Sequence, residues 1–283
     1  MPSRTDFKYS LTRRALIGAG AAGSVLQPWR VWAEPRCQLG GRTIAIGAPG
    51  GLSIGLQSYP RTLALEPGEV VITLDDGPLP GQTDRVLDAL RLYGAPATFF
   101  LIGRNAAANP QLVRRMGAEG HTVAHHTMNH PWTLRQRSFD VGMRDIEEGI
   151  RAVQAAQGIT GSAVATPFFR YPGFADTPRL NDWLAQNGMV VFGSDLWGSD
   201  WTPMSPERQL SLLMGRLKRA GRGIILLHDV VGQTAAMFPA FLQALCAGGF
   251  KVVRVTPGAF APAIVEAGHG WRSYTERIIA GRG

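Results

Sequence analysis

Two adjacent carboxylates, Asp75 and Asp76, stand where an apolar segment of this 283-residue chain ends. They follow residues 70–74 and precede Gly77 and Pro78, which stop an extended strand. Two carboxylates held close together need a cation or a shared proton to offset their repulsion. Because Asp and Gly are also ordinary turn residues, the pair alone is equally typical of a turn or a helix cap.

A histidine cluster about fifty residues downstream favours the cation. Residues 120–131 contain four of the six histidines of the chain. His126 and His130 are four residues apart, so a single helical turn would place both imidazoles on one side, as a shared metal requires. Thr127 stands where the metalloprotease pattern has its glutamate, so a general base must come from elsewhere. Two imidazoles and one carboxylate leave coordination positions open for water and substrate, as in catalytic sites.

The elements that must position these residues alternate along the chain. Seven apolar segments have the length and composition of buried strands: 70–74, 97–102, 122–125, 167–171, 189–194, 223–228 and 251–255. Six helical patterns, each closed by glycine, lie between them: 83–93, 110–119, 138–157, 178–187, 206–220 and 234–247. Such alternation predicts parallel βα units in one α/β domain, either a barrel or a doubly wound sheet.

The polar residues favour the barrel over the doubly wound sheet. Candidate site residues stand at the carboxyl ends of different predicted strands, and in α/β barrels that rim carries the active site. They are Asp75 and Asp76, His125 and His126, Arg170, Asp195 and His228.

Thr73-Leu-Asp-Asp-Gly-Pro78 followed by His126-Thr-x-x-His130-Pro131 resembles the first two motifs of the polysaccharide deacetylases. These are the family 4 carbohydrate esterases, which include nodulation-type chitooligosaccharide deacetylases. Residues 168–173, 195–201 and 224–229 are similar to the third, fourth and fifth motifs, and 97–103 lies between the first two. The resemblance covers roughly residues 66–256 and implies a distorted (β/α)7 barrel, which agrees with the seven predicted strands.

The resemblance also implies a metal site and a base. Asp76, His126 and His130 would bind a divalent metal, foremost Zn²⁺, with Co²⁺ or a similar ion as the alternative. Such an ion lowers the pKa of a bound water to about 7 and polarises an amide carbonyl. Asp75 would take the proton of that water, and Arg170 would pair with Asp75 and keep it ionised.

On the opposite rim, His228 would donate a proton to the departing sugar amine, without which an amide does not break easily. Either Asp200 or Asp195 would orient and charge His228, and the resemblance favours Asp200. His121 and His125, the remaining neighbours of the metal cluster, are expected to be core or supporting residues and not ligands.

The substrate side departs from the family pattern at one position. Residues expected beside the substrate are Tyr171, Gly173, Trp201 and Leu226. Gly173 replaces the tyrosine that usually follows Arg-x-Pro in the third motif, so a backbone donor for the oxyanion remains while an aromatic wall is lost. Tyr171, Phe174 or Trp201 would compensate. Leu74, where phenylalanine is common, is a conservative replacement.

The resemblance implies a metal-dependent hydrolase that removes N-acetyl groups from an N-acetylglucosamine-containing glycan, namely chitooligosaccharide, peptidoglycan or poly-N-acetylglucosamine. Alternatives are the same chemistry on a non-sugar N-acyl or cyclic amide, a non-catalytic carbohydrate-binding relative, and a structural envelope protein. The joint presence of Asp75 and His228 argues against the binding-only alternative. The expected partner is the N-acetylated glycan; no nucleic-acid motif and no protein partner is evident.

Residues 1–33 resemble a twin-arginine export signal. Arg13 and Arg14 precede an apolar run, 15–26, that is too short to span a bilayer, and Val31-Trp-Ala33 suits signal peptidase. The mature chain is expected to begin near Glu34, in the periplasm or outside the cell, without a membrane span. A disordered basic N-terminus and an uncleaved anchor are the alternatives. Residues 1–33 hold five basic and one acidic residue, so their removal leaves +4 of the formal +8 charge.

The remaining segments predict a lead-in at 34–65, a catalytic domain at 66–256 and a C-terminal tail at 257–283. Neither the lead-in nor the tail carries a motif that indicates a function. Cys37 and Cys246, the two cysteines of the chain, could form one bridge in the periplasm or remain two thiols.

Overall fold

A computed structural model describes residues 37–161 and 163–276. The predicted export signal lies outside these residues. Within them, no helix combines the length and the hydropathy needed to cross a membrane.

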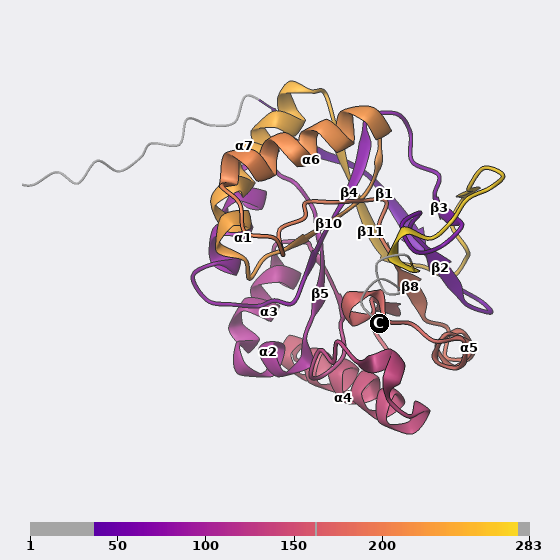
Figure 1. The fold of residues 1–283 in the computed structure, drawn as a ribbon. Helices are drawn as coiled ribbons and strands as arrows, with labels where there is room; N and C mark the ends of the chain where they lie inside the picture. Colours follow the sequence, from indigo (N-terminus) through magenta and orange to yellow (C-terminus); the bar gives the residue numbers. More distant parts are fainter. Residues whose placement is uncertain (1–36, 162, 277–283) are drawn as a thin grey trace, which may run out of the picture. The chain divides into compact units, whose positions relative to one another are not determined.

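Twelve strands and seven α-helices are described (Figure 1). The strands are β1 (Gly40–Ile46), β2 (Leu52–Ile54), β3 (Arg61–Leu63), β4 (Glu69–Asp75), β5 (Thr98–Leu101), β6 (Thr122–His125), β7 (Phe168–Phe169), β8 (Val190–Phe192), β9 (Leu196–Trp197), β10 (Gly223–His228), β11 (Lys251–Pro257) and β12 (Ile264–Glu266). The helices are α1 (Thr83–Leu92), α2 (Gly103–Ala108), α3 (Pro110–Ala118), α4 (Phe139–Gln157), α5 (Pro178–Gln186), α6 (Pro206–Ala220) and α7 (Gly232–Ala247).

Ten of the strands form one sheet in which every ladder is parallel. Its order is β1-β11-β4-β5-β6-β7-β8-β2, with β10 pairing β4 and β9. Between β2 and β10, single backbone hydrogen bonds take the place of a ladder. The Gln57 N–H, after β2, donates to the Ser194 carbonyl at 2.8 Å. The Asp195 N–H, before β9, donates to the Ile224 carbonyl of β10 at 2.8 Å. The fold is therefore α/β, as predicted, with a distorted, barrel-like sheet.

The helices cover the outer face of this sheet. Contacts link them in the order α6-α7-α1-α3-α4-α5, and Figure 1 shows α6 and α7 lying across the same part of the sheet. Several begin and end at strong local signals. For example, the Ser205 hydroxyl accepts a hydrogen bond from the Arg208 N–H at the start of α6, and Gly221 adopts a left-handed conformation at its end.

Strand residues alternate between two apolar layers, as the period of two requires. Val70, Ile72 and Leu74 of β4 pack with the helices, whereas Val71 belongs to a second cluster inside the curved sheet. Phe100, Ala124, Phe168, Phe192 and Ile224 fill the same interior. Thr73 and Asp75 share the parity of Val71, so the carboxylate at the end of β4 faces the inside of the sheet and not the helices.

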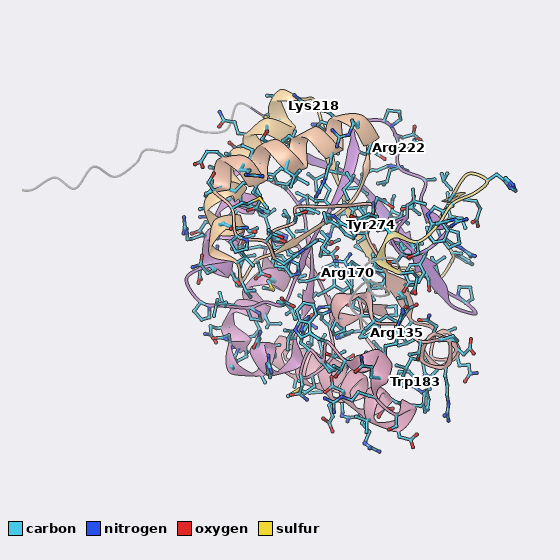
Figure 2. All side chains as sticks on the ribbon, viewed as in Figure 1. Arg135, Arg170, Trp183, Lys218, Arg222 and Tyr274 are labelled. Carbon is cyan, nitrogen blue, oxygen red and sulfur yellow. A yellow bond between two sulfur atoms is a disulfide. The ribbon has the colours of Figure 1, made fainter. Side chains whose placement is uncertain are left out.

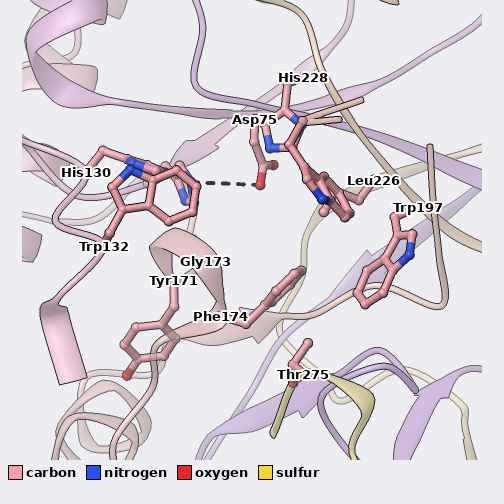
Figure 3. Close-up of a pocket in the computed structure, with 12 residues that line it drawn as sticks. Asp75, His130, Trp132, Tyr171, Gly173, Phe174, Trp197, Leu226, His228 and Thr275 are labelled. Atoms are coloured by element: carbon pink, nitrogen blue, oxygen red, sulfur yellow. Dashed lines mark ion pairs between the residues drawn. The ribbon is translucent and has the colours of Figure 1, made fainter. Parts of the chain in front are cut away.

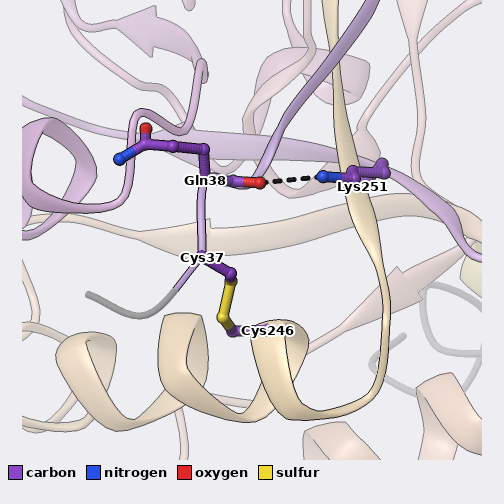
Figure 4. Close-up of a disulfide and its surroundings, with 4 residues drawn as sticks. All are labelled: Cys37, Gln38, Cys246 and Lys251. Atoms are coloured by element: carbon purple, nitrogen blue, oxygen red, sulfur yellow. Dashed lines mark hydrogen bonds between the residues drawn. A yellow bond between two sulfur atoms is a disulfide. The ribbon is translucent and has the colours of Figure 1, made fainter.

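The segments on either side of the predicted catalytic region pack against it. β1 pairs with β11, β2 pairs with β8, and β3 forms a two-stranded antiparallel sheet with β12. Cys37 and Cys246 form a disulfide that ties the segment before β1 to the end of α7 (Figure 4), with their Cα atoms 6.2 Å apart. The predicted lead-in thus contains β1, β2 and β3, and the first two of these strands belong to the main sheet.

Candidate active site

Asp75 and Arg170 form a buried ion pair near the centre of the structure (Figure 2). The Arg170 Nη1 donates to Asp75 Oδ1 at 2.6 Å and to the Thr73 hydroxyl at 2.8 Å. Its other nitrogens donate to the carbonyls of Phe192 and Gly193 at 3.1 and 2.7 Å. Burial raises the pKa of Asp75, and the positive charge of Arg170 opposes that rise. The carboxylate is therefore held in one orientation at the end of β4.

Asp76 leaves the strand in a left-handed conformation, with φ of 77°. Its N–H donates to the Phe100 carbonyl at 3.1 Å, and its carbonyl accepts from the Asn105 side-chain amide at 2.8 Å. Left-handed φ in a non-glycine residue costs about 1–3 kcal/mol and is concentrated at functional sites. These contacts turn the Asp76 carboxylate away from that of Asp75 and toward the histidines.

His126 follows β6, and its ring is oriented by the neighbouring strand. Its Nδ1 lies 2.7 Å from the Arg170 carbonyl, an acceptor, so Nδ1 carries the proton and Nε2 keeps its lone pair. A carbonyl on the far nitrogen of an imidazole is the usual support of a metal-binding histidine. The same residue, Arg170, thus orients Asp75 through its side chain and His126 through its backbone.

His130 reaches the site from a loop, so the predicted helical turn from His126 to His130 is wrong. Thr127 and His130 have φ of 63° and 55°, outside the helical region, and the His130 N–H donates to the Thr127 hydroxyl at 3.0 Å. The Asp145 carbonyl accepts from the Met128 N–H at 2.9 Å. The loop also packs on α4 at Gly149, where a Cβ would lie 2.3 Å from the Thr127 backbone. Contacts with α4, and not the hydrogen bonds of a helical turn, therefore fix the loop that carries His130.

Asp76, His126 and His130 offer ligand atoms that all lie within 4.8 Å of one another. Asp76 Oδ1 is 3.5 Å from His126 Nε2 and 3.3 Å from His130 Nε2. This buried oxygen has no hydrogen-bond partner among the described residues. Burial raises the pKa of Asp76 to about 6 and lowers those of His126 and His130 to about 3, so both imidazoles are neutral. Two neutral imidazoles and an unsatisfied carboxylate oxygen fit a divalent cation.

His228, at the end of β10, pairs with Asp200. Its Nδ1–H donates to Asp200 Oδ1 at 2.9 Å, and its backbone N–H donates to Asp200 Oδ2 at 2.7 Å. The Thr234 hydroxyl also donates to Oδ2, at 2.8 Å. Burial lowers the pKa of His228, but the charges of Asp200, Asp76 and Asp75 outweigh it and raise the pKa to about 10. His228 is therefore positively charged at neutral pH.

Asp195, the alternative partner, lies elsewhere. Its Oδ1 accepts from the Leu56 N–H, and its Oδ2 accepts from the Thr62 hydroxyl and the Ile224 N–H, all at 2.8 Å. Ile224 is near the start of β10, whereas His228 ends it. The expectation that Asp195 stands on the same rim as the other site residues is wrong, because Asp195 precedes β9 and ties β2, β3 and β10 together.

A cavity of about 360 Å³ joins these groups (Figure 3). It brings together the predicted residues Asp75, His126, His130, Tyr171, Gly173, Trp201, Leu226 and His228, and Phe174. It also contains three residues that the motifs did not single out: Trp132, Trp197 and Thr275. Trp132 directly follows the second motif, and Trp197 lies within the fourth. Their position near these motifs is the sequence feature that could have predicted them as cavity residues. Thr275 carries no signal, since it lies far from every motif.

The C-terminal segment brings Thr275 to the cavity. The N–H groups of Tyr274 and Thr275 donate to the Gln57 carbonyl at 2.9 and 3.1 Å. The next residue, Glu276, pairs with Arg135 at 2.7 Å. Thr275 therefore forms part of the wall of the site.

His121 and His125 lie outside the three-residue cluster. The Ala97 N–H donates to His121 Nδ1 at 3.2 Å, and His125 is fully buried. Burial lowers the pKa of each to about 4, so both are neutral core residues.

An α/β fold whose strand ends gather histidines and carboxylates around one aromatic cavity has the arrangement of an enzyme site. Residues 63–192 match the family described as polysaccharide deacetylase. A chitooligosaccharide deacetylase of Sinorhizobium fredii is 33% identical over 174 residues, which cover 62% of this chain and 77% of that protein. A peptidoglycan-N-acetylglucosamine deacetylase of Bacillus cereus is 34% identical over 198 residues, covering 66% of this chain and 86% of that protein.

Solved structures agree with this relationship. A peptidoglycan deacetylase of Bdellovibrio bacteriovorus is 27% identical with a TM-score of 0.69, and the match covers 79% of this chain and 60% of that chain. This chain therefore spans less than two thirds of that structural neighbour. Identity above 30% over most of two curated relatives, together with the shared fold, shows that the chain belongs to the polysaccharide deacetylase family.

Proposed function

We propose that the chain removes N-acetyl groups from an N-acetylglucosamine-containing polysaccharide or oligosaccharide in a metal-dependent hydrolysis. One observation carries the proposal. A base candidate, Asp75, and an acid candidate, His228, line the same cavity as His126 and His130, whose ring nitrogens face the Asp76 carboxylate. Amide hydrolysis needs both a proton acceptor for water and a proton donor for the leaving amine.

Asp76, His126 and His130 would hold the metal, which we propose to be Zn²⁺, with Co²⁺ or a similar ion able to replace it. When bound, such an ion polarises the amide carbonyl and makes water more acidic. The neutral state of both imidazoles and the unpaired Asp76 oxygen support this assignment.

The residues of the chain divide the proton transfers between them. Asp75 takes a proton from the attacking water, and Arg170 fixes its orientation and offsets the cost of its burial. His228, charged by Asp200, gives a proton to the amine nitrogen as the carbon–nitrogen bond breaks. The Gly173 N–H would donate to the oxyanion, while Tyr171, Trp201 and Leu226 would contact the substrate.

The test is acetate release by metal-loaded protein from three substrates: chitooligosaccharide, peptidoglycan and poly-N-acetylglucosamine. We expect release from at least one of them, lost on chelation and restored by Zn²⁺ or Co²⁺. If none releases acetate while a non-sugar N-acyl compound is hydrolysed, the sugar assignment is wrong. If glycans bind but no amide is cleaved, the chain is a carbohydrate-binding relative.

The metal assignment has its own control. His126→Ala should lower metal affinity by more than about 100-fold and abolish acetate release, because it removes a ligand outright. His269→Ala, an exposed histidine outside the cavity, should leave both unchanged. Full metal content in His126→Ala, measured by mass spectrometry, would contradict the assigned triad.

We further propose that residues 1–33 direct export to the periplasm or the exterior, leaving 34–65, 66–256 and 257–283 as lead-in, catalytic region and tail. The Cys37–Cys246 disulfide supports this location, since such bonds persist in oxidising compartments. Replacing Arg13 and Arg14 by lysine should retain the protein in the cytoplasm. Unchanged export would count against the twin-arginine route.

A further inference from the structure

The third motif lacks its usual tyrosine at Gly173, and the structure contains an aromatic ring in that place. A Cβ added to Gly173 would lie 3.0 and 3.2 Å from two ring atoms of Trp132. Gly173 also has φ of 54°, which a side chain would disfavour. The indole of Trp132, which comes from the loop after His130, therefore occupies the wall that a side chain at 173 would form.

Trp132 is anchored on one edge and open on the other. Its ring meets the His130 imidazole edge to face, with centroids 4.7 Å apart and an interplanar angle of 81°. Yet the residue is 63% exposed, compared with 44% for Trp201 and 7% for Trp197, the other two tryptophans of the cavity. It lines the cavity on the side of His130, away from Trp197 (Figure 3). Exposed indole beside a reaction centre is apolar area that a ligand could cover.

On the other side of the centre stands Trp201, which is 44% exposed and packs 6.1 Å from the His228 ring. An aromatic ring therefore stands on each side of the centre, one next to the proposed metal ligand His130 and one next to the proposed acid His228. A single acetamide at the centre cannot cover both indoles, but a chain of sugar rings passing through the cavity would.

We propose that Trp132 is a specificity-determining residue that stacks on the sugar ring next to the one being deacetylated, so that the enzyme selects oligomers over single sugars. This inference rests on the proposed function. The open side of Trp132 would contact the apolar face of a pyranose ring, and the small residue at 173 is the condition that lets the indole lie there.

The experiment compares unsubstituted protein with Trp132→Ala and Trp132→Phe on N-acetylglucosamine oligomers of increasing length. In Trp132→Ala we expect KM for the tetramer to rise about tenfold, the scale of one lost ring contact, with kcat within about twofold. Activity on the monomer should not change, and Trp132→Phe should recover most of the affinity. Phe260→Ala, an aromatic residue that is 82% exposed and outside the cavity, is the matched control and should behave as the unsubstituted protein.

Two further measurements keep the proposal testable. Metal content should be equal in all variants, and calorimetry in an Asp75→Asn background should show the same length-dependent loss of binding when Trp132→Ala is added. An equal loss for monomer and tetramer, or a loss of metal, would mean that Trp132 only shields His130, and would overturn the inference. Acetate release by the unsubstituted protein with no effect of Trp132→Ala would also overturn it. No release from any oligomer by the unsubstituted protein would instead count against the proposed function.

Discussion

Arg170 orients both Asp75 and His126. Its guanidinium donates a hydrogen bond to the Asp75 carboxylate, and its backbone carbonyl accepts one from the His126 ring. Each of its three bonded nitrogens donates to a group of the sheet interior, and its guanidinium carbon lies 4.3 Å from the centroid of the Phe100 ring. A buried cation with this many partners has one orientation. The proposed base, Asp75, and the proposed ligand, His126, are consequently fixed relative to each other by a single residue.

Asp75→Asn tests the base. The amide keeps the size of the carboxylate but cannot accept the proton of water, so kcat should fall by about 10²–10⁴-fold. Metal content should be unchanged because Asp75 is not one of the three proposed ligands. Metal analysis and acetate release on the same preparation check both points. Full activity with bound metal would show that another group is the base.

Asp200→Asn tests the acid through its pH dependence. The proposed mechanism needs a charged His228, whose pKa is raised to about 10, so acetate release should decline as the pH rises through that value. Removing the Asp200 charge takes away a principal cause of the raised pKa, and the alkaline limb of kcat/KM should move to lower pH by more than about one unit. Asp195→Asn, the same substitution away from His228, is the control and should leave the limb in place.

At the scale of elements, the site depends on how short strands are tied to long ones. Asp195 accepts three hydrogen bonds, from residues at β2, β3 and β10, while being almost fully buried. β9 itself has two residues and pairs with β10 at only two positions. In this region the Asp195 carboxylate therefore holds neighbouring segments together, as the backbone hydrogen bonds between longer strands do elsewhere in the sheet.

Asp195→Ala should lower the free energy of unfolding by about 3 kcal/mol, because it leaves buried donors without an acceptor. The alkaline limb of the pH profile of kcat/KM should not move, because the hydrogen bond between His228 and Asp200 remains. Urea unfolding of Asp195→Ala beside Asp182→Ala, an exposed aspartate of α5, measures the difference. An unchanged unfolding midpoint with a displaced alkaline limb would reverse the roles of Asp195 and Asp200.

The sequence predicted the long elements and the residues at their ends. All seven predicted strands and six predicted helices exist, because a continuous apolar run such as 70–74 or a glycine after a periodic segment such as Gly221 is a local property. Strands β1, β2, β3, β9 and β12 and helix α2 correspond to none of the predicted ranges. The strands of two or three residues, such as β2 and β9, form only because a partner strand supplies the hydrogen bonds.

The part of the site that depends on residue types and their places in the sequence was predictable, whereas the part that depends on tertiary contacts was not. Asp76, His126 and His130 meet as their types suggested, but the loop between the histidines is held by α4 and not by helical spacing. Only the family resemblance favoured Asp200 over Asp195 as the partner of His228, since both are acidic residues of one short motif; the tertiary contacts distinguish them. Backbone hydrogen bonds to Gln57 bring Thr275 to the cavity, and no pattern of side chains in the sequence predicts such bonds.

At the scale of the whole molecule, the disulfide and the active site lie at opposite ends of the strands. Cys246 ends α7 just before β11 begins, and Cys37 precedes β1, so the bridge joins elements at the starts of strands. Asp75 and His228 stand where β4 and β10 finish. Stability and catalysis should therefore respond separately to reduction.

The bridge closes a loop of 209 residues in sequence separation, and a cross-link of that span restricts the unfolded chain strongly. Replacing both cysteines by serine should lower the free energy of unfolding by about 4 kcal/mol, while kcat measured well below the unfolding temperature should change by less than about twofold. Denaturant unfolding with and without reductant checks this, and reductant should have no effect on the double variant because the chain has no other cysteine. A large fall in kcat on reduction, without loss of stability, would mean that the bridge positions the rim and does not merely hold the strand starts together.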